Sequence, residues 1–257
     1  MARILLKTKH KKHSIMKIHL AFFFLLILPT SVFCQNDIKI FKPIDSFKVD
    51  LSNKKKNEID RQNQLLEQTN LTELEKSELD TLLQKYGEVV GNIWDVIDKG
   101  CSWYCGGGNY KVVTSSELQS TKKYNYSANS ANDLSYKTAW VEGKSDAGKG
   151  EFIEYYFKND SPRITTIIIS NGYQKNNAVW KNNNRVKAIK LHVNGSAFGI
   201  LQLTDAKTDQ VFKVGTLGHN PDGTDLVLRF EILEVYQGDK YNDTAITEIY
   251  FDGIDVH

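Results

Sequence analysis

The side chains best suited to ligand binding gather in one segment, "NGYQKNNAVWKNNNR", which spans residues 171–185. It combines the aromatic residues Tyr173 and Trp180 with Asn183 and Arg185. An aromatic ring can stack on the apolar face of a sugar, while amide and guanidinium groups make directional hydrogen bonds to its hydroxyls. These residues therefore predict a carbohydrate-binding loop. The alternative for Trp180 is that it packs beneath its own loop.

A second polar and aromatic turn, "YQGDKYND", spans residues 236–243 and leads into the last predicted strand. We include Lys240 and Tyr241 among the candidate glycan-binding residues, because this turn can border the same rim. Alternatively, the two residues only cover the end of the fold.

The first 34 residues have the layout of a secretory signal peptide, with a basic stretch, an apolar run at 20–28 and a break at Pro29. A membrane-spanning helix needs roughly 20 apolar residues, so this run is too short. We expect no membrane span, cleavage before Gln35, and a secreted or cell-envelope protein. The alternative is a lipid anchor on Cys34.

Cleavage would also change the charge of the protein. The leader contains six basic residues and no acidic residue, so 27 basic residues would face 31 acidic ones, a net charge of −4. The basic footprint that nucleic-acid binding requires is therefore missing, and we expect no nucleic-acid partner.

Two cysteines remain after such a cleavage, Cys101 and Cys105 of "CSWYC". Export would place them in a compartment where disulfides form, and their even number favours a local bridge. Two unpaired thiols are the alternative. A structural zinc site needs about four ligands, and the remaining histidines show no ligand spacing.

The chain divides into segments of different composition. Residues 35–56 are polar and lysine-rich without a sustained period, which is typical of a linker. Residues 57–100 have a helical pattern, in which Thr72 and Glu75 form a capping box and Gly87 ends a helix. The leucines of this helical segment pack either within the protein or against a partner protein.

Residues 101–257 consist largely of short segments rich in β-branched and aromatic residues, separated by Asn, Gly, Asp and Pro. This pattern predicts a β-sandwich or jelly roll. The last segment, "TAITEIYF", alternates like a half-buried strand, with Glu248 as its unusual member. The predicted strands are "FIEYYF", "ITTIIIS", "RVKAIKLHVNG", "GILQLT", "QVFKV", "DLVLRFEILEVY" and "TAITEIYF".

Several blocks in residues 101–257 together resemble one family: "CSWYCGGG", "KTAWVEG", "SNGYQKN", "RVKAIKLHVNG" and "YNDTAITEIYFDGIDVH". They are similar to the discoidin-like (F5/8 type C, galactose-binding-like) domain of the NAD glycohydrolase translocation type. The resemblance implies a mainly β protein, a discoidin-like jelly-roll β-sandwich that follows a short α-helical segment. It also implies glycan binding, and it places Asn183 where sugar-binding relatives contact their ligand.

The resemblance further implies a structural calcium ion. In the wider family a loop with an Asp, a Thr and a Trp in this order surrounds the metal, and a Glu on the final strand completes the site. Asp133, Thr138 and Glu248 match these positions, although Leu134 stands where the family often has glycine. Carboxylate, hydroxyl and carbonyl oxygens are the ligands that calcium prefers. The alternative is that Asp133 caps its loop and Glu248 pairs with a lysine or a backbone donor.

Catalysis finds little support in the sequence. The carboxylates and histidine of "FDGIDVH" lie at a chain end, where residues are usually frayed. "GGG" at 106–108 lacks the Lys-Ser/Thr of a phosphate loop, so we expect no organic cofactor. The sequence therefore predicts a non-catalytic glycan-binding module. The alternative is a protein-interaction or adhesion domain that uses the helical segment and the sandwich edge.

Overall fold

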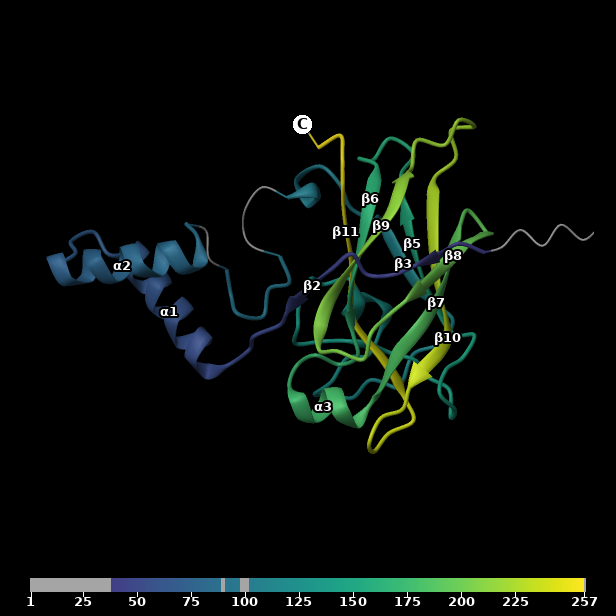
Figure 1. Cartoon of the computed structure of the whole chain (residues 1–257), viewed down its shortest axis with the longest axis horizontal. Helices are drawn as coiled ribbons and strands as arrows, with labels where there is room; N and C mark the ends of the chain where they lie inside the picture. Colours follow the sequence, from purple (N-terminus) through teal and green to yellow (C-terminus); the bar gives the residue numbers. More distant parts are fainter. Residues whose placement is uncertain (1–37, 89–90, 98–101, 257) are drawn as a thin grey trace, which may run out of the picture. The chain divides into compact units, whose positions relative to one another are not determined.

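The computed structural model describes residues 38–88, 91–97 and 102–256 (Figure 1). The predicted leader, Cys34 and Cys101 lie outside these residues, so cleavage, the lipid anchor and the disulfide stay predictions. Within the described ranges, no helix has the length and apolar character needed to cross a membrane.

Strands make up most of the described chain, and every strand named from the sequence is present (Figure 1). The predicted mainly β fold is therefore confirmed. In chain order the strands are β1 (Ile40–Phe41), β2 (Asp45–Lys48), β3 (Lys111–Thr114), β4 (Trp140–Val141), β5 (Phe152–Phe157), β6 (Ile164–Asn171), β7 (Asn184–Val193), β8 (Ser196–Gln202), β9 (Thr208–Leu217), β10 (Leu226–Tyr236) and β11 (Thr244–Gly253).

The strands form two packed layers. The hydrogen-bonded order is β2-β9-β6-β11-β7-β10-β5-β3, with β8 beside β7 and β4 beside β11. Strand β11 is antiparallel to β6 and pairs in parallel with the start of β7 at Thr244 and Ala245, which joins the layers. Aromatic residues of both layers meet in the core, where the rings of Tyr155 and Phe251 lie 5.2 Å apart edge to face.

The N-terminal segment contributes strands of its own. Strand β1 pairs in parallel with β8, and β2 pairs antiparallel with β9. Phe41 is buried beside Phe198, with the two rings stacked 5.8 Å apart. Within residues 35–56, which we interpreted as a linker, strands β1 and β2 thus satisfy backbone groups that β8 and β9 would otherwise expose at sheet edges. Strands of two to four residues are too short to give a readable period.

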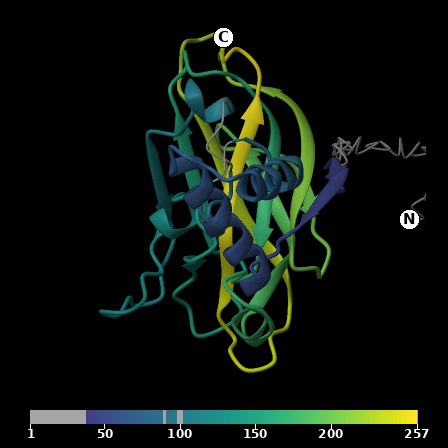
Figure 2. The same cartoon turned by 90° about the vertical axis from the view of Figure 1, so that its left-hand side faces the viewer.

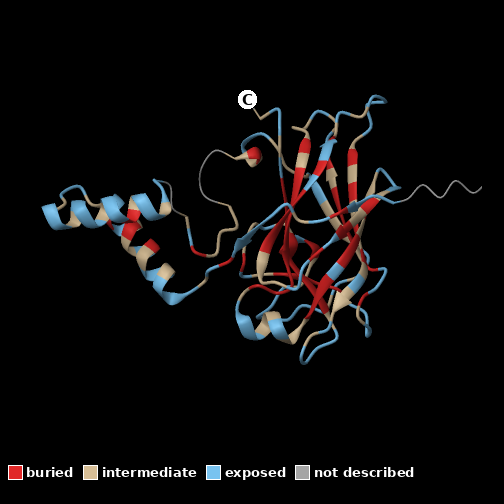
Figure 3. Ribbon diagram, viewed as in Figure 1, coloured by how far each residue is buried: buried red, intermediate tan, exposed pale blue. Residues whose placement is uncertain are grey.

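Two helices precede the sandwich, α1 (Asn53–Glu67) and α2 (Glu73–Tyr86). The predicted capping box is present, because Thr72 Oγ1 accepts from the Glu75 N–H and Glu75 accepts from the Thr72 N–H. The predicted helix end at Gly87 is also confirmed, with φ at 84°. Arg61 donates to Glu78 across the pair. Both helices expose most of their residues (Figure 3).

Strand β11 differs from its prediction, because it is buried on both faces rather than on one. It runs through the middle of the fold with strands on either side (Figure 2). On the outer face, Tyr250 packs with Val96, Tyr104 and Leu134. The segments around residues 96, 104 and 134 therefore cover the side that the sequence pattern assigned to solvent. Glu248, on this covered side, is fully buried.

Candidate functional site

A groove of about 450 Å³ opens among loops that follow β3, β6 and β10. Four tyrosines give it its character, and we call it the tyrosine groove. Its lining residues are Leu118, Tyr124, Tyr126, Val141, Tyr173, Lys175, Asn176, Val179, Asn183, Tyr241 and Asp243.

The tyrosines differ in how they are held. Tyr124 and Tyr126 stack with ring centroids 6.3 Å apart, and the Tyr126 carbonyl accepts from the N–H of Val141 in β4. Tyr173 is buried, and its hydroxyl donates to the Lys137 carbonyl at 3.1 Å. Tyr124 and Tyr241 are 38% and 43% exposed. The groove therefore has a fixed floor and an accessible aromatic rim.

The Tyr241 side of the rim is tied to the short helix α3 (Asn177–Asn182). The N–H of Tyr241 donates to the Asn182 carbonyl at 2.8 Å, and the Lys240 N–H donates to the same oxygen. Asn176 caps α3, because its side chain accepts from the Val179 N–H at 3.0 Å. Two loops distant in sequence are thus fixed side by side.

Polar groups with unused hydrogen-bonding capacity also line the tyrosine groove. Asn183 Nδ2 donates to the Val179 carbonyl at 2.8 Å, which leaves its Oδ1 available. Within the described part of the chain, neither Lys175 nor the Asp243 carboxylate forms an ion pair. Partial burial raises the pKa of Asp243. Burial, followed by the nearby Tyr124 and Asp243, raises the pKa of Tyr126, so this phenol remains a hydrogen-bond donor at neutral pH.

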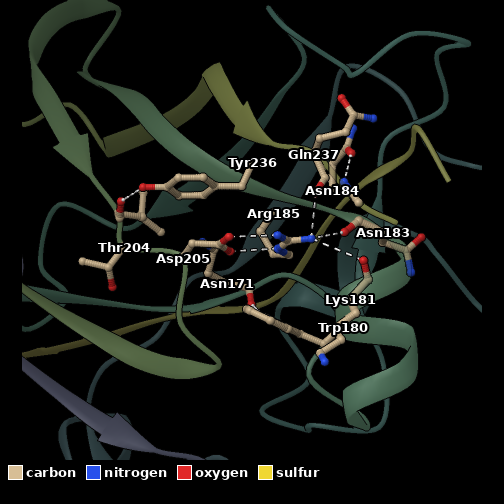
Figure 4. Close-up of polar contacts among 12 residues, drawn as sticks. Asn171, Trp180, Lys181, Asn183, Asn184, Arg185, Thr204, Asp205, Tyr236 and Gln237 are labelled. Carbon is tan, nitrogen blue, oxygen red and sulfur yellow. Dashed lines mark hydrogen bonds and ion pairs between the residues drawn. The ribbon is translucent and has the colours of Figure 1, made fainter. Parts of the chain in front are cut away.

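The other end of the same loop forms a closed cluster around Arg185 (Figure 4). The Arg185 guanidinium pairs with both Asp205 oxygens at 2.9 Å and donates to the Lys181, Asn183 and Gln237 carbonyls. The guanidinium carbon Cζ of Arg185 lies 4.8 Å from the centroid of the Trp180 ring. This arginine is therefore occupied by internal contacts.

Trp180 belongs to the same cluster. Its Nε1 donates to the Asn171 carbonyl at 3.0 Å, and the side chain is half-buried. Gly172 makes the packing feasible, because a Cβ there would meet the indole at 2.9 Å and its φ is 75°. The arrangement corresponds to the alternative in which Trp180 packs against its own loop.

The six predicted glycan-binding residues are thus divided. Tyr173, Asn183 and Tyr241 line the tyrosine groove, whereas Trp180, Arg185 and Lys240 do not. Sequence reasoning missed Tyr124 and Tyr126. The available signal was "KKYNYSAN", two alternating tyrosines in a polar, lysine-rich loop.

The three predicted metal ligands come together at a different place. Thr138 Oγ1 donates to Asp133 Oδ2 at 2.6 Å, and the Leu134 N–H donates to Glu248 Oε2 at 2.7 Å. Leu134 has φ at 54°, a left-handed conformation that explains why glycine suits this position. The final strand and the long loop therefore meet as the resemblance implies.

The electrostatics of this cluster favour a cation. Glu248 Oε1 is buried and has no hydrogen-bond partner within the described ranges. Burial, then repulsion from Asp133, raises the pKa of Glu248 well above its ordinary range, and burial also raises the pKa of Asp133. Two carboxylates, a hydroxyl and nearby backbone carbonyls form a donor set that fits calcium. Among the described residues no group of three or more His, Cys, Asp or Glu side chains is suited to a metal, so backbone and hydroxyl oxygens would have to complete the shell.

Comparison with known families identifies the chain. Residues 103–252 match the family described as the NAD glycohydrolase translocation F5/8 type C domain. The match covers more than half of the sequence, and the chain belongs to this family. The β-sandwich is accordingly a discoidin-like jelly roll, and the predicted resemblance is confirmed. No curated protein matches the chain.

Similar solved structures include modules from Clostridium perfringens. The CBM32-1 and CBM32-2 domains of ZmpB match with 13% identity and a TM-score of 0.41, covering 57% of this chain and 34% of that one. This chain thus spans about a third of that length. The GH89 module CBM32-5, in complex with GalNAc-β-1,3-galactose, has 18% identity and a TM-score of 0.38 over 55% of this chain and 94% of that one. CBM32-3 from a family 31 glycoside hydrolase has 16% identity and a TM-score of 0.39 over 56% and 92%.

Proposed function

We propose that this protein is a secreted, non-catalytic glycan-binding module and that the tyrosine groove is its binding site. The observation that carries the proposal is the composition of the groove. Exposed rings of Tyr124 and Tyr241 stand at its rim, and the side chains of Asn183, Lys175 and Asp243 lie beside them. Stacking surfaces next to directional polar groups suit a sugar ring. Secretion is supported by the leader-like layout of residues 1–34.

The expected affinity for a single sugar is low. A monosaccharide has about a dozen heavy atoms, and about 0.3 kcal/mol for each gives a total near 4 kcal/mol. This corresponds to a Kd of about 1 mM. Multivalent display can raise the apparent affinity by roughly 10² or more, so immobilised glycans are the appropriate test.

The test compares wild-type protein with Tyr124→Ala and Tyr241→Ala on a glycan array. Both variants should lose the array signal, because the rim would no longer offer a stacking surface. Tyr110→Ala is the matched control, since Tyr110 is also half-exposed but does not line the groove. Undiminished binding by the two rim variants, or no binding by the wild type, would contradict the proposal.

We also propose that calcium binds at Asp133, Thr138 and Glu248 and stabilises the fold. The support is the buried Glu248 Oε1, which has no hydrogen-bond partner in the part of the chain that the structure describes and lies near the second carboxylate, Asp133. A cation at this position would neutralise the repulsion between the two groups. Its role would be structural, since Asp133, Thr138 and Glu248 do not line the tyrosine groove.

A second candidate function is protein interaction through the helical segment. One observation favours it: Leu66 and Leu74, near the connection between α1 and α2, are 46% and 85% exposed. Sedimentation velocity at rising concentration would test association between copies. Self-association that Leu66→Ser/Leu74→Ser abolishes would support this function, and a wild type that stays monomeric would argue against association between copies.

A further inference from the structure

A second groove, of about 480 Å³, adjoins the tyrosine groove and shares Lys175 and Asn176 with it. Three lysines distinguish it, and we call it the lysine groove. Its lining residues are Lys48, Val49, Asp50, Leu51, Ser52, Lys175, Asn176, Asn177 and Lys207.

The lysines come from three separate parts of the chain. The register between β2 and β9 places Lys48 opposite Thr208, which directly follows Lys207. Lys175 lies in the loop after β6, and its ammonium nitrogen is 5.6 Å from the Tyr124 ring centroid. Lys175 thus lies at the junction of the two grooves.

The positive charge of the lysine groove is not balanced by the protein. Within the described ranges, none of the three lysines forms an ion pair, whereas Lys144, Lys158 and Lys187 elsewhere on the sandwich do. Three lysines face a single carboxylate, Asp50, which leaves a net charge of +2 along the lining.

Asp50 is itself engaged. Its Oδ1 accepts from the Ser52 N–H at 2.9 Å, and hydrogen bonds from the Ser52 backbone and side chain lower its pKa. Burial lowers the pKa of Lys207, and the attraction of Asp50 offsets only part of that effect. A bound anion would offset the burial of the Lys207 ammonium and balance the net positive charge of the lining.

We propose that the lysine groove binds an anionic sugar residue, carrying a carboxylate or a sulfate, next to the ring held in the tyrosine groove. This proposal rests on the proposed glycan-binding function, and it names the class of glycan. Lys175 belongs to both grooves, so one glycan can occupy them in succession, with its aromatic-stacked ring on one side and its charge on the other.

A nucleic acid fits these observations less well than an acidic glycan. Neutralising a run of phosphates takes an extended basic track. The lysine groove has only three lysines in its lining. The chain without its predicted leader carries more acidic than basic residues. A compact positive groove beside aromatic rings suits one charged sugar instead.

The test uses an array that carries the same oligosaccharides in neutral, uronic-acid and sulfated forms. The wild type should bind at least one anionic form about tenfold more tightly than its neutral counterpart, a difference of about 1.4 kcal/mol, and 0.5 M NaCl should reduce the preference. Lys48→Gln/Lys207→Gln should abolish the preference and leave neutral binding unchanged. Lys213→Gln, an exposed lysine of β9 outside the groove, is the matched control and should behave as the wild type.

The outcomes separate the two proposals. Equal binding of neutral and anionic forms would overturn the anionic class and leave glycan binding intact. A preference that survives in Lys48→Gln/Lys207→Gln would also overturn it. Absence of binding to every form would refute both proposals. Equally tight binding of a single-stranded DNA oligonucleotide would show that the lysine groove takes any polyanion, and the sugar class would then be wrong.

Discussion

The segment 171–185 contributes aromatic and polar side chains to two regions that behave in opposite ways. At one end, Arg185 and Trp180 are bound to each other and to three backbone carbonyls and Asp205. Tyr173, near the other end of the segment, borders an open groove together with the side chain of Asn183. Asn183 belongs to both regions, because its carbonyl accepts from Arg185 while its side chain lines the groove.

The difference lies in how many polar atoms the fold itself has satisfied. In the Arg185 cluster nearly every donor has an internal acceptor, so a ligand would gain little there. In the tyrosine groove, the Asp243 carboxylate and the Lys175 ammonium have no ion-pair partner in the described part of the chain. Aromatic and amide composition alone therefore indicates where side chains gather, and unused hydrogen-bonding capacity indicates where a ligand can bind.

The largest effect on stability should come from breaking the closed region. Arg185→Ala removes the donor to Asp205 and to the Asn183 and Gln237 carbonyls, while the Lys181 carbonyl keeps the Asp239 N–H. The Arg185 side chain is 8% exposed and that of Asp205 is 37% exposed, and we expect the loss of these hydrogen bonds to cost about 3 kcal/mol. Urea unfolding would measure the loss. The control is Lys187→Ala, on the same strand as Arg185. It removes an exposed ion pair with Glu234 of β10 and should leave the urea midpoint unchanged. An Arg185→Ala variant as stable as the wild type would mean that the cluster is not a structural unit.

In the Asp133 and Glu248 cluster, a buried carboxylate oxygen has no hydrogen-bond partner among the described residues. If calcium binds this oxygen, it stabilises the folded state by RT ln(1 + [L]/Kd), about 2.7 kcal/mol at a hundredfold excess over Kd. The melting temperature should fall when EGTA is added. Glu248→Gln removes one charged ligand, so its melting temperature should no longer respond to calcium or EGTA. If the wild type is also insensitive to EGTA, the cluster is a hydrogen-bond network without metal.

The sequence was most informative where a residue pattern repeats. The strands were predicted because alternating β-branched and aromatic residues mark them, and the Thr72 capping box because a helix start has a local signature. The contact between the Asp133 loop and Glu248 was predicted from the family resemblance and not from a local pattern, because these residues are more than 100 positions apart. No local pattern could reveal that pairing.

The differences between the sequence-based expectations and the structure also have physical causes. Strand β11 was expected to have a solvent face, but segments around residues 96, 104 and 134 cover it, and such covering is a property of the tertiary fold. The assignment of Trp180 and Arg185 to a binding site could not take Asp205 into account, because Asp205 reaches Arg185 only when β7 and β8 pair. Tyr124 and Tyr126 were overlooked because a polar loop has no period.

The buried carboxylate of Asp209 belongs to a closed, internally hydrogen-bonded region, and it should make the stability of the protein depend on pH. It accepts from the hydroxyls of Ser170, Tyr136 and Tyr250, yet burial outweighs these bonds and raises its pKa. The folded state therefore holds a proton that the unfolded state releases, so stability falls as pH rises from the ordinary Asp value near 4 toward the raised value. The Asp209→Asn variant carries no titrating carboxyl group at this position, so its stability should not fall in this pH window. Relative to the wild type, its free energy of unfolding should rise across the window by up to about 1.4 kcal/mol per unit of pKa difference. Parallel pH profiles of the two proteins would exclude this effect.

The smallest effect on stability, and the most specific one on binding, should come from the open region. Tyr241 is 43% exposed, and its hydroxyl makes no hydrogen bond within the described residues. The turn is tied to α3 by backbone N–H groups, those of Asp239, Lys240 and Tyr241. Tyr241→Ala keeps these backbone bonds, so the free energy of unfolding should change by no more than about 0.5 kcal/mol. Glycan binding should nevertheless be lost, because a stacking ring would be missing from the rim. Tyr241→Phe keeps the ring and should retain the array signal, which separates stacking from hydrogen bonding by the phenol. If Tyr241→Ala instead destabilises the protein as strongly as Arg185→Ala, both regions are structural and the ligand must bind elsewhere.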